Sequence, residues 1–295
     1  MKIIVTGAGG QDGYYLINWL TGLGHDVCGT VRSGDPARYK YLNIDSGDNL
    51  MLVQADLLDY SSLLSLRQLE PDMVINLAGL TSPPAAWGTP ELTLSTNGMG
   101  PVRLMEVFNN PDLKFIQFGS IAEFGPYGAS KLYAEKMMDD YRVRGYHVST
   151  IRFAGHHSPR RSPVFFSKKV VQAVAAIKAG LQGDLQLGPV SRSQDWGAAP
   201  DFMQAVIEIM DKEPGTYTVS TGDPHTLTEF VDLAFEAAGL TASDYVSSDT
   251  HIVQPTDVES LSVKPDSRLS WRPGRTFEGL VDWLVQAEMA ALKDG

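Results

Sequence analysis

Three evenly spaced glycines near the start of the chain limit the possible folds more than any other feature. The apolar run KIIVTG at residues 2–7 leads into Gly7, Gly10 and Gly13, and a helical pattern follows. A strand that passes through such a turn into a helix lets the backbone approach a pyrophosphate, for which the helix N-terminus supplies N–H groups and a favourable dipole. Because strand, glycines and helix occur in this order, the segment is predicted to bind a dinucleotide.

The end of the next apolar run, residues 26–32, indicates which dinucleotide fits. An acidic residue at this point would accept hydrogen bonds from the ribose hydroxyls of NAD. The chain has Arg32 and Ser33 instead, and a guanidinium suits the additional phosphate of NADP. The predicted cofactor is therefore NADP, with a solvated surface arginine as the alternative interpretation.

Three other short segments are expected to border the same cofactor. Gln11 and Asp12 lie between the second and third glycines, where Asp12 is expected to support the turn. Asp56 and Leu57 follow the third apolar run, where the edge of an adenine would rest. Ala78 follows the fourth run, where a small residue lets a cofactor pass.

Apolar runs alternate with helical patterns through the first half of the chain. This alternation predicts an α/β fold of the Rossmann type, a doubly wound parallel sheet with helices on both faces. The predicted strands are residues 2–7, 26–32, 49–55, 72–78, 113–120 and 146–153. The predicted helices between them are residues 11–23, 61–68, 90–108 and 127–144.

The pattern changes near residue 154, where loops rich in Pro, Gly and Arg begin. We expect residues 1–153, with returning elements from the C-terminal half, to form the NADP-binding domain, and residues 154–295 to form a smaller substrate-binding region. The helices predicted in the second half are residues 164–179, 199–210, 227–238 and 276–292. The tryptophans expected to lie in the core are Trp87, Trp196, Trp271 and Trp283.

Composition excludes several classes of partner. The formal net charge of the 295 residues is −11, and there is no long basic run, which argues against nucleic acid or an anionic membrane. No apolar stretch is long enough to cross a bilayer.

The single cysteine, Cys28, fits a reducing compartment, so a cytoplasmic protein is expected. His156 and His157 have no third ligand at suitable spacing, so no metal site is expected.

A serine, a tyrosine and a lysine in the middle of the chain predict catalytic chemistry. Ser120 ends the fifth apolar run, and Tyr127 and Lys131, four residues apart, share one face of a helix. A lysine ammonium beside a phenol lowers the phenol pKa, so Tyr127 would exchange a proton with a substrate hydroxyl or ketone while a nicotinamide exchanges a hydride. Ser120 would hydrogen-bond the same oxygen, and Tyr127 and Lys131 would also contact the cofactor.

The sequence resembles the extended short-chain dehydrogenases/reductases, and the GDP-mannose 4,6-dehydratases most. The segments that carry the resemblance, in the same order in both, are TGAGGQDGYYL, GTVRS, HHSPRR, AIKAGLQGDLQLG and QDWGAAPDF. The resemblance implies bound NADP, a nucleotide-diphosphate sugar as substrate, and homodimers or homotetramers. It favours Lys169 and Arg192 as substrate ligands, and it matches Asn97 to a helix asparagine that supports the cofactor side. His156 is expected to line the cofactor or substrate cleft.

Two departures from this family bear on the chemistry. The 4,6-dehydratases carry a glutamate two residues after the catalytic serine or threonine, which removes the proton at sugar carbon 5, whereas this chain has Ala122 there and Glu123 one residue later. One step along the backbone turns a side chain to another side, so Glu123 is a candidate base only with a local rearrangement. In addition, a long Pro-rich loop is missing, since only Pro126 separates Gly125 from Tyr127. The pocket is then either ordinary, in a divergent member, or more open and suited to a larger substrate.

Three functions remain open on the sequence. The first is a 4,6-dehydratase that acts on GDP-mannose or a close relative. The second is a nucleotide-sugar 4-epimerase or 4-keto reductase, because the Ser-Ile-Ala pattern at residues 120–122 resembles epimerases, which need no base for carbon 5. The third is a non-catalytic NADP-binding protein that kept the fold.

Overall fold

The computed structural model describes residues 1–32, 49–249 and 260–294. In this part of the chain two compact units are present. Unit 1 comprises Met1–Phe153, Met203–Val219 and Asp266–Trp271. Unit 2 comprises Ala154–Phe202, Ser220–Pro265 and Arg272–Gly295. Two of the three segments of unit 1 therefore come from the C-terminal half of the sequence.

Among the described residues of unit 1, seven parallel strands form one sheet in the order β11-β6-β5-β4-β1-β2-β3. Their bounds are β1 Lys2–Thr6, β2 Asp26–Val31, β3 Leu50–Gln54, β4 Met73–Asn76, β5 Lys114–Ser120, β6 Val148–Phe153 and β11 Thr216–Val219. The chain winds in one direction from β1 to β3 and in the other from β4 to β11. The switch point between β1 and β4 is where open α/β sheets bind ligands, at the carboxyl ends of the strands.

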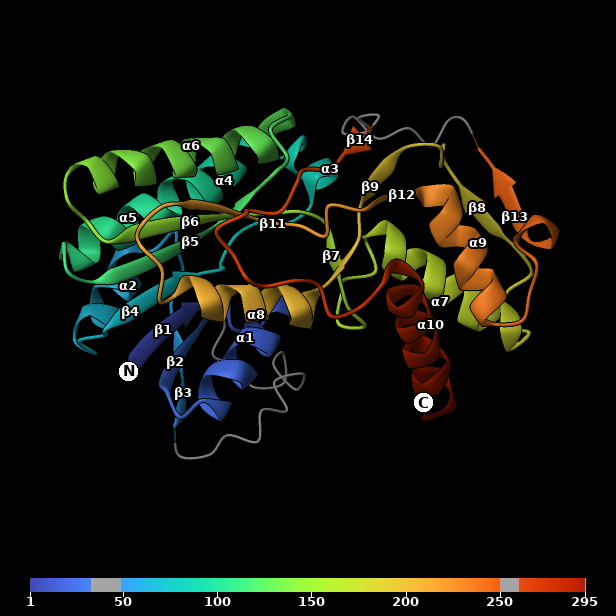
Figure 1. Ribbon diagram of the computed structural model, residues 1–295, viewed down its shortest axis with the longest axis horizontal. Helices are drawn as coiled ribbons and strands as arrows, with labels where there is room; N and C mark the ends of the chain where they lie inside the picture. The colour runs from blue at the N-terminus through green and yellow to red at the C-terminus, as the bar shows by residue number, and fades with distance from the viewer. Residues whose placement is uncertain (33–48, 250–259, 295) are drawn as a thin grey trace. The chain divides into compact units, whose positions relative to one another are not determined.

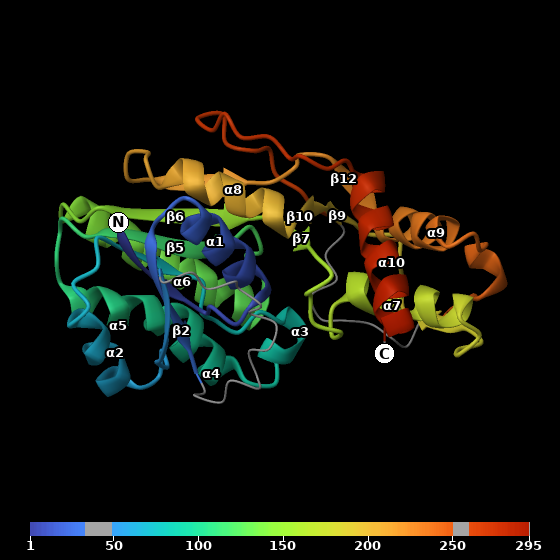
Figure 2. The same ribbon diagram turned by 90° about the horizontal axis from the view of Figure 1, so that it is seen from below.

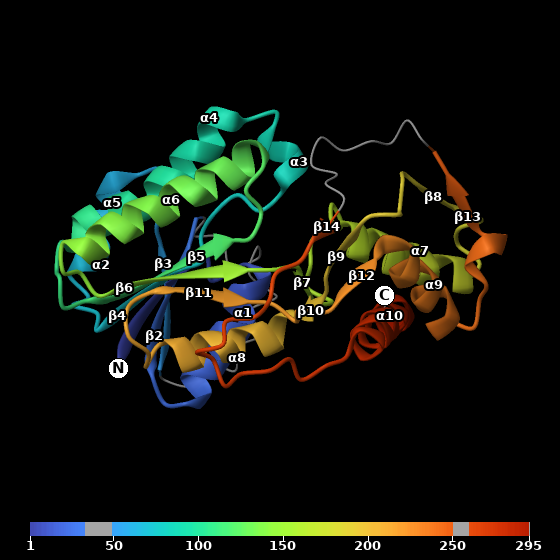
Figure 3. The ribbon, with the colours of Figure 1, turned by 45° about the horizontal axis from the view of Figure 1, so that its top comes forward.

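Helices cover both faces of this sheet (Figure 1). The helices α2 (Tyr60–Arg67), α5 (Met99–Phe108) and α6 (Gly125–Val143) lie on one face. The other face carries α1 (Gln11–Gly22) and α8 (Ala199–Ile209), as Figure 3 shows with the sheet nearly edge-on. The predicted Rossmann-type α/β fold is confirmed.

The strands are buried on both faces, which explains why their sequences are continuous apolar runs rather than alternating ones. Ile3, Ile4 and Val5 are all fully buried although they point alternately to the two faces. On the face of α5 and α6, Ile4 belongs to one apolar cluster with Leu104 and Met138. Burial of such side chains contributes roughly 1.5–3 kcal/mol each relative to leaving them exposed.

Two parts of unit 1 differ from the sequence-based expectation. The strand β11 was not predicted, because TYTV is only four residues long and joins the edge of the sheet from a distant part of the chain. The helix predicted over residues 90–108 is divided into α4 (Pro90–Thr93), a π-helical turn at Leu94–Gly98, and α5. Pro101 lacks the N–H that would bond the carbonyl four residues earlier, and a wider turn absorbs this defect.

Unit 2 is built on three helices, α7 (Phe166–Lys178), α9 (Leu227–Ala237) and α10 (Phe277–Asp294). In Figure 2, α10 lies against α7. Their core contains Trp196, whose ring stacks on Phe230 with centroids 4.5 Å apart. A capping box of Thr226 and Glu229 fixes the start of α9.

The other described elements are α3 Pro83–Ala86, β7 His156–His157, β8 Leu185–Leu187, β9 Ser193–Asp195, β10 Gly197–Ala198, β12 Pro224–Thr226, the 3-10 turn Ala242–Asp244, β13 Val246–Ser248 and β14 Ser260–Leu261.

The C-terminal segment Asp266–Trp271 is tied to unit 1 through Glu208 of α8. The Glu208 carboxylate accepts hydrogen bonds from the backbone N–H groups of Ser270 and Trp271, both at 2.8 Å. Burial alone would raise the pKa of Glu208, but the hydrogen bonds from Ser270, Trp271 and Lys212 lower it to about 2. The charged carboxylate therefore stabilises the folded state.

Glu208→Gln is expected to lower the free energy of unfolding at pH 7 by about 2 kcal/mol. The folded pKa lies below the ordinary value of 4.5, so this stabilisation is complete above pH 4.5 and is lost as the pH falls towards 2. Thermal unfolding at several pH values measures it, with the exposed Glu236→Gln as control. Equal unfolding midpoints for the two variants at pH 7 would contradict this account.

Candidate active site

The glycine turn after β1 is packed so closely that side chains do not fit in it. Gly7 has a φ of +73°, and a Cβ there would lie 2.9 Å from the backbone nitrogen of Ala78. A Cβ on Gly13 would lie 2.5 Å from the carbonyl oxygen of Gly7. Gly10 closes the turn by donating its N–H to the Gly7 carbonyl at 3.0 Å. The geometry fits a backbone cradle for a pyrophosphate.

The first turn of α1 begins directly after this cradle. Its N-cap is Gly10, which has no side chain to bond the first N–H groups of the helix. Gln11 donates from Nε2 to Oδ1 of Asp12 at 3.0 Å. Asp12 thus lies at the edge of the turn, and its carboxylate also acts on Lys131 of α6, as described below.

The candidate adenine and ribose contacts lie at the ends of β2 and β3. Arg32 follows the last residue of β2 and has an exposed side chain, while its carbonyl accepts a hydrogen bond from Gln54. Ser33 lies outside the described residues. The Asp56 carboxylate accepts the N–H of Leu58 at 2.9 Å. Leu57 is buried and packs against Gly100 of α5, so its side chain belongs to the core.

The loop after β4 lies beside the glycine turn and is fixed by two side chains. The N–H of Ala78 donates to Oγ1 of Thr6 at 3.1 Å. Asn97, in the π-helical turn, accepts the N–H of Leu80 at 2.7 Å and donates to its carbonyl at 2.9 Å. A Cβ on Gly79 would lie 2.8 Å from Oδ1 of Asn97 and 3.7 Å from Nζ of Lys131. The small residues at this point therefore bring the loop next to Lys131.

Lys131 is the most deeply buried charged group of the predicted catalytic set. Its side chain extends from α6 so that Nζ donates to the carbonyl of Phe118 in β5 at 2.9 Å, and the residue is only 7% exposed. Burial lowers the pKa of Lys131 to about 8, and the Asp12 carboxylate acts in the opposite direction. Its Nζ lies 6.0 Å from the centroid of the Tyr127 ring. The structure thus brings Tyr127, Lys131 and the glycine turn to one region of unit 1.

Ser120 ends β5 and begins the short connection to α6. Its Oγ accepts the N–H of Ala122 at 3.0 Å, and the N–H of Ile121 donates to the Phe153 carbonyl at 3.1 Å. A Cβ on Gly128 would lie 2.4 Å from the carbonyl carbon of Glu123. The connection is therefore a tight turn that packs directly on the first turn of α6, which only a glycine at residue 128 permits.

Glu123 is exposed, and its carboxylate interacts electrostatically with the guanidinium of Arg152. Arg152 of β6 forms a bidentate ion pair with Glu135, with Nε to Oε2 at 2.7 Å and Nη2 to Oε1 at 2.5 Å. These hydrogen bonds raise the pKa of Arg152, and the Glu123 carboxylate acts in the same direction. Sequence reasoning missed this pair, although Glu135 lies one turn beyond Lys131 on the same face of α6.

Two aromatic side chains beside the short connection from Ser120 to Tyr127 are exposed. A Cβ on Gly125, whose φ is +69°, would lie 3.1 Å from the Trp87 ring. Trp87 is 49% exposed and Phe124 is 75% exposed. The expectation that Trp87 lies in the core is wrong, because the shortened connection covers only part of its ring, whereas Trp196 and Trp271 are buried as expected.

The predicted contacts from the second half of the chain all belong to unit 2. His156 has its Nδ1 2.8 Å from the Ala154 carbonyl, and its ring stacks on Phe202. Lys169 donates to the carbonyl of Gln186 at 3.2 Å. Arg192 is half-buried. Lys169 and Arg192 supply two cations to unit 2 in an otherwise acidic chain.

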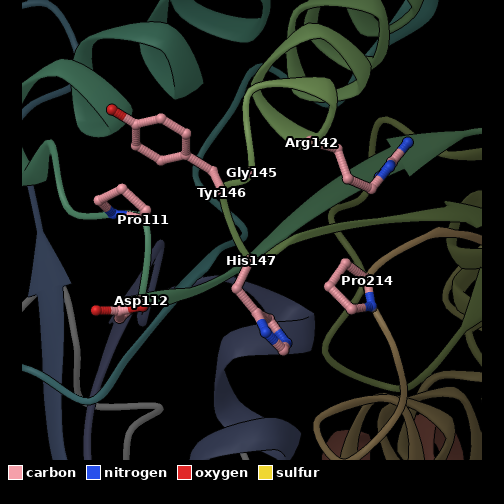
Figure 4. A pocket seen from close by; sticks show the side chains of 7 residues that line it. All are labelled: Pro111, Asp112, Arg142, Gly145, Tyr146, His147 and Pro214. Atoms are coloured by element: carbon pink, nitrogen blue, oxygen red, sulfur yellow. The ribbon is translucent and has the colours of Figure 1, made fainter.

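A pocket of unit 1 lies at the amino ends of three strands, whereas the glycine turn follows the carboxyl end of β1. Figure 4 shows the side chains that line this pocket. Pro111, His147 and Pro214 precede the amino ends of β5, β6 and β11 respectively. Arg142, at its wall, donates to the Val148 carbonyl and pairs with Asp139. This pocket is separate from the predicted catalytic groups.

The described part of the chain contains neither a metal-binding cluster nor a membrane-spanning helix. No group of three or more His, Cys, Asp or Glu side chains in this part of the chain is placed to hold a metal ion. None of its helices combines the length and apolar character needed to span a membrane.

Comparisons with known proteins identify the family to which the sequence is similar. Residues 4–283 match the family model described as GDP-mannose 4,6 dehydratase. The chain is 32% identical to GDP-mannose 4,6 dehydratase 1 of Arabidopsis thaliana, over 98% of this chain and 90% of that protein. It is 28% identical to the human GDP-mannose 4,6 dehydratase, over 98% of this chain and 92% of that protein.

Solved structures show the same fold at lower identity. RMD from Pseudomonas aeruginosa, complexed with NADPH, superposes with a TM-score of 0.80 at 21% identity, over 98% of this chain and 99% of that one. The dTDP-glucose 4,6-dehydratase of Bacillus anthracis, in complex with NAD, gives 0.81 at 19% identity, over 99% and 98%. The UDP-glucose 4-epimerase of Thermotoga maritima, with UDP-glucose, gives 0.84 at 19% identity, over 99% and 100%.

The family model covers most of the chain, and the whole-length relatives agree with it. The chain therefore belongs to the GDP-mannose 4,6-dehydratase family of the extended short-chain dehydrogenases/reductases, and it is an enzyme of the dehydratase and epimerase type.

Proposed function

We propose that this enzyme is an NADP-dependent nucleotide-sugar 4,6-dehydratase that acts on GDP-mannose or a close relative. The observation that carries the proposal is the buried ammonium of Lys131, which lies beside Tyr127 and next to the loop that borders the glycine turn. This placement suits a group that binds the nicotinamide ribose and favours the phenolate of Tyr127. Membership in an enzyme family sets aside a non-catalytic role.

The chain's own groups would handle the protons of the reaction. The bound nicotinamide supplies the hydride acceptor for sugar carbon 4 and the hydride donor for carbon 6. Tyr127 takes the proton of the hydroxyl at carbon 4, and Ser120 hydrogen-bonds the same oxygen. Glu123 removes the proton at carbon 5, so that water can leave from carbons 5 and 6.

Several features support NADP as the cofactor. The cradle excludes side chains at Gly7 and Gly13, where a Cβ would lie 2.9 Å and 2.5 Å from backbone atoms, and so lets the backbone approach a pyrophosphate. Arg32 directly follows β2, is exposed and has no carboxylate beside it in the sequence, which suits a ribose phosphate. RMD from Pseudomonas aeruginosa, which shares the fold, is complexed with NADPH.

We propose that Ser120, Lys169 and Arg192 contact the nucleotide sugar. Lys169 and Arg192 are proposed to bind the diphosphate, and His156 to line the cofactor or substrate cleft. A homodimer built on helices is proposed as well, because Leu92, Leu94 and Tyr133 of α4, the π-helical turn and α6 are each about 40% exposed. Two such dimers would form the tetramer.

A 4-epimerase or 4-keto reductase is the second candidate. One observation favours it specifically: Ala122 replaces the carboxylate of the dehydratases, while Glu123 is exposed and lies in the field of Arg152. An epimerase needs Ser120, Tyr127 and Lys131 but no base for carbon 5. The Thermotoga maritima UDP-glucose 4-epimerase shares the fold.

The product of GDP-mannose, incubated with the protein and NADP, is expected to be lighter by one water in mass spectrometry. Tyr127→Phe should reduce the rate of its formation by about 10²–10⁴-fold, because the phenolic proton acceptor is lost. Tyr60→Phe, at an exposed tyrosine of α2, is the control and should retain the wild-type rate. An unchanged mass with wild-type protein that binds NADP would rule out the dehydratase.

Glu123→Gln tests the assignment of the base. If Glu123 removes the proton at carbon 5, the rate of dehydration by the variant should fall by at least about 10²-fold. The variant should still reduce NADP, which the absorbance of the reduced nicotinamide measures. Glu91→Gln, an exposed carboxylate on α4, serves as control. Wild-type turnover in the Glu123 variant, with a 4-epimer as product, would instead establish the second candidate.

Arg32→Ala is expected to weaken NADP binding by about 10–100-fold, because a charge-assisted contact to phosphate contributes about 1.5–3 kcal/mol. Binding of NAD should change little. Titration calorimetry of both nucleotides measures the effect, with Arg67→Ala in α2 as control. Equal affinity of wild type and Arg32→Ala for NADP would refute the proposed role of Arg32.

A further inference from the structure

A row of buried polar side chains crosses the sheet of unit 1 near its carboxyl edge. The strand register pairs Thr6 with Asn76, Asn76 with Gln117, and Gln117 with Thr150. All four residues are at most 1% exposed. Because buried polar groups are costly unless they are hydrogen-bonded, four of them side by side across four strands call for an explanation.

The first three members of the row form a chain of hydrogen bonds. Oγ1 of Thr6 donates to Oδ1 of Asn76 at 2.5 Å, and Nδ2 of Asn76 donates to Oε1 of Gln117 at 2.7 Å. Nε2 of Gln117 then donates to the carbonyl oxygen of Phe118 at 2.8 Å. Each amide uses both its oxygen and its nitrogen, so the orientation of one fixes the orientation of the next.

Both ends of this hydrogen-bonded chain reach the candidate active site. At the first end, the N–H of Ala78, in the loop that borders the glycine turn, donates to Oγ1 of Thr6 at 3.1 Å. At the other end, Nζ of Lys131 donates to the same Phe118 carbonyl that accepts from Gln117, at 2.9 Å. The Phe118 carbonyl thus holds a buried ammonium and is itself held by a buried amide.

The row faces the helix layer that carries Lys131. Ile4, Val74, Phe115 and Val148 lie two residues before the four members on the same strands, and all of them belong to the apolar cluster with α2, α5 and α6. Side chains two residues apart on a strand point to the same face. The amide of Gln117 and the ammonium of Lys131 therefore approach the Phe118 carbonyl within the same layer.

We propose that Gln117, supported by Asn76 and Thr6, is a positioning residue that fixes the Phe118 carbonyl and through it the Lys131 ammonium. This inference rests on the proposed function, in which Lys131 binds the cofactor and assists Tyr127. Gln117 contacts no reacting atom. Its role is to keep the acceptor of the ammonium in one place and to link that acceptor to the loop after β4.

The physical reason is the cost of a buried charge. An ammonium removed from water is disfavoured unless an acceptor compensates, so a displaced carbonyl would favour the neutral amine. The charged or titratable groups near Lys131 are Asp12 of α1, which favours the ammonium, and Tyr127 of its own helix. Glu135, one turn further along α6, is paired with Arg152.

Thr150 provides a matched control within the same row. It lies opposite Gln117 on β6 and is equally buried, but its Oγ1 has no hydrogen-bond partner among the described residues. Thr150→Val therefore removes a buried hydroxyl without breaking the chain to Lys131. Gln117→Met keeps a similar volume and removes both of its hydrogen bonds.

The test is a titration of Lys131 by NMR in protein labelled with ¹³C at lysine Cε, with the signal assigned by its loss in Lys131→Met. Gln117→Met should lower the pKa of Lys131 by about one unit from its value near 8, and Thr150→Val should leave it unchanged. Thr6→Val, an isosteric change at the far end of the chain, should shift it in the same direction by less, and it replaces Gln117→Met if that variant does not fold. If the pKa of Lys131 were the same in Gln117→Met or Thr6→Val as in Thr150→Val, the inference would be wrong.

This titration needs neither cofactor nor nucleotide sugar. Failure of the proposed function would show instead as the absence of water loss from GDP-mannose by the wild type. In active protein, the alkaline limb of the rate against pH should move to lower pH in Gln117→Met and stay in place in Thr150→Val, a difference that a loss of stability alone does not produce.

Discussion

The buried ammonium of Lys131 is the interaction on which the rest of the candidate active site depends. Its removal from water costs several kcal/mol unless an acceptor and a nearby charge compensate. The Phe118 carbonyl of β5 supplies the acceptor, and Asp12 of the glycine turn supplies the charge. One side chain of α6 is thereby coupled to a central strand and to the turn expected to bind the cofactor. A Cβ on Gly79 would lie 3.7 Å from this ammonium, and the amide of Gln117 donates to the carbonyl that accepts from it.

The sequence predicted the parts of this arrangement that rest on local pattern. The glycine turn, six of the strands and the Tyr-x-x-x-Lys helix follow from spacing, because period and turn chemistry are local properties. The strand β11 and the polar row were missed, since both depend on which distant segments lie side by side. Asn76 and Gln117 were visible only as single polar letters within the apolar runs DMVINLA and LKFIQFGS. The role of Asp12 was underestimated, because its effect on Lys131 acts across α1 and α6.

The connection between Ser120 and Tyr127 contains both departures that the sequence predicts relative to the 4,6-dehydratases, namely Ala122 and the single residue before Tyr127. Packing of Gly128 against the turn at Glu123 shows that the short connection is an ordered turn, and Trp87 and Phe124 are exposed beside it. A more open aromatic surface suits a larger substrate than a closed wall does. The same turn bears on the choice of reaction, because it holds Ala122 at the position where a dehydratase is expected to carry its base, and the Glu123 carboxylate raises the pKa of Arg152. The Ser-Tyr-Lys groups are common to both candidate reactions, so the proton at carbon 5 distinguishes them.

The most direct test of this account is therefore the fate of that proton. GDP-mannose is incubated with the protein and NADP in D₂O, and the position of deuterium in the product is determined by NMR. We expect a dehydrated sugar with one solvent-derived deuterium at carbon 5, because removal of the proton there must be followed by return of one from solvent. A sugar that is oxidised or epimerised at carbon 4 with no deuterium at carbon 5 would contradict this expectation and would establish that the chain works without a base at that position.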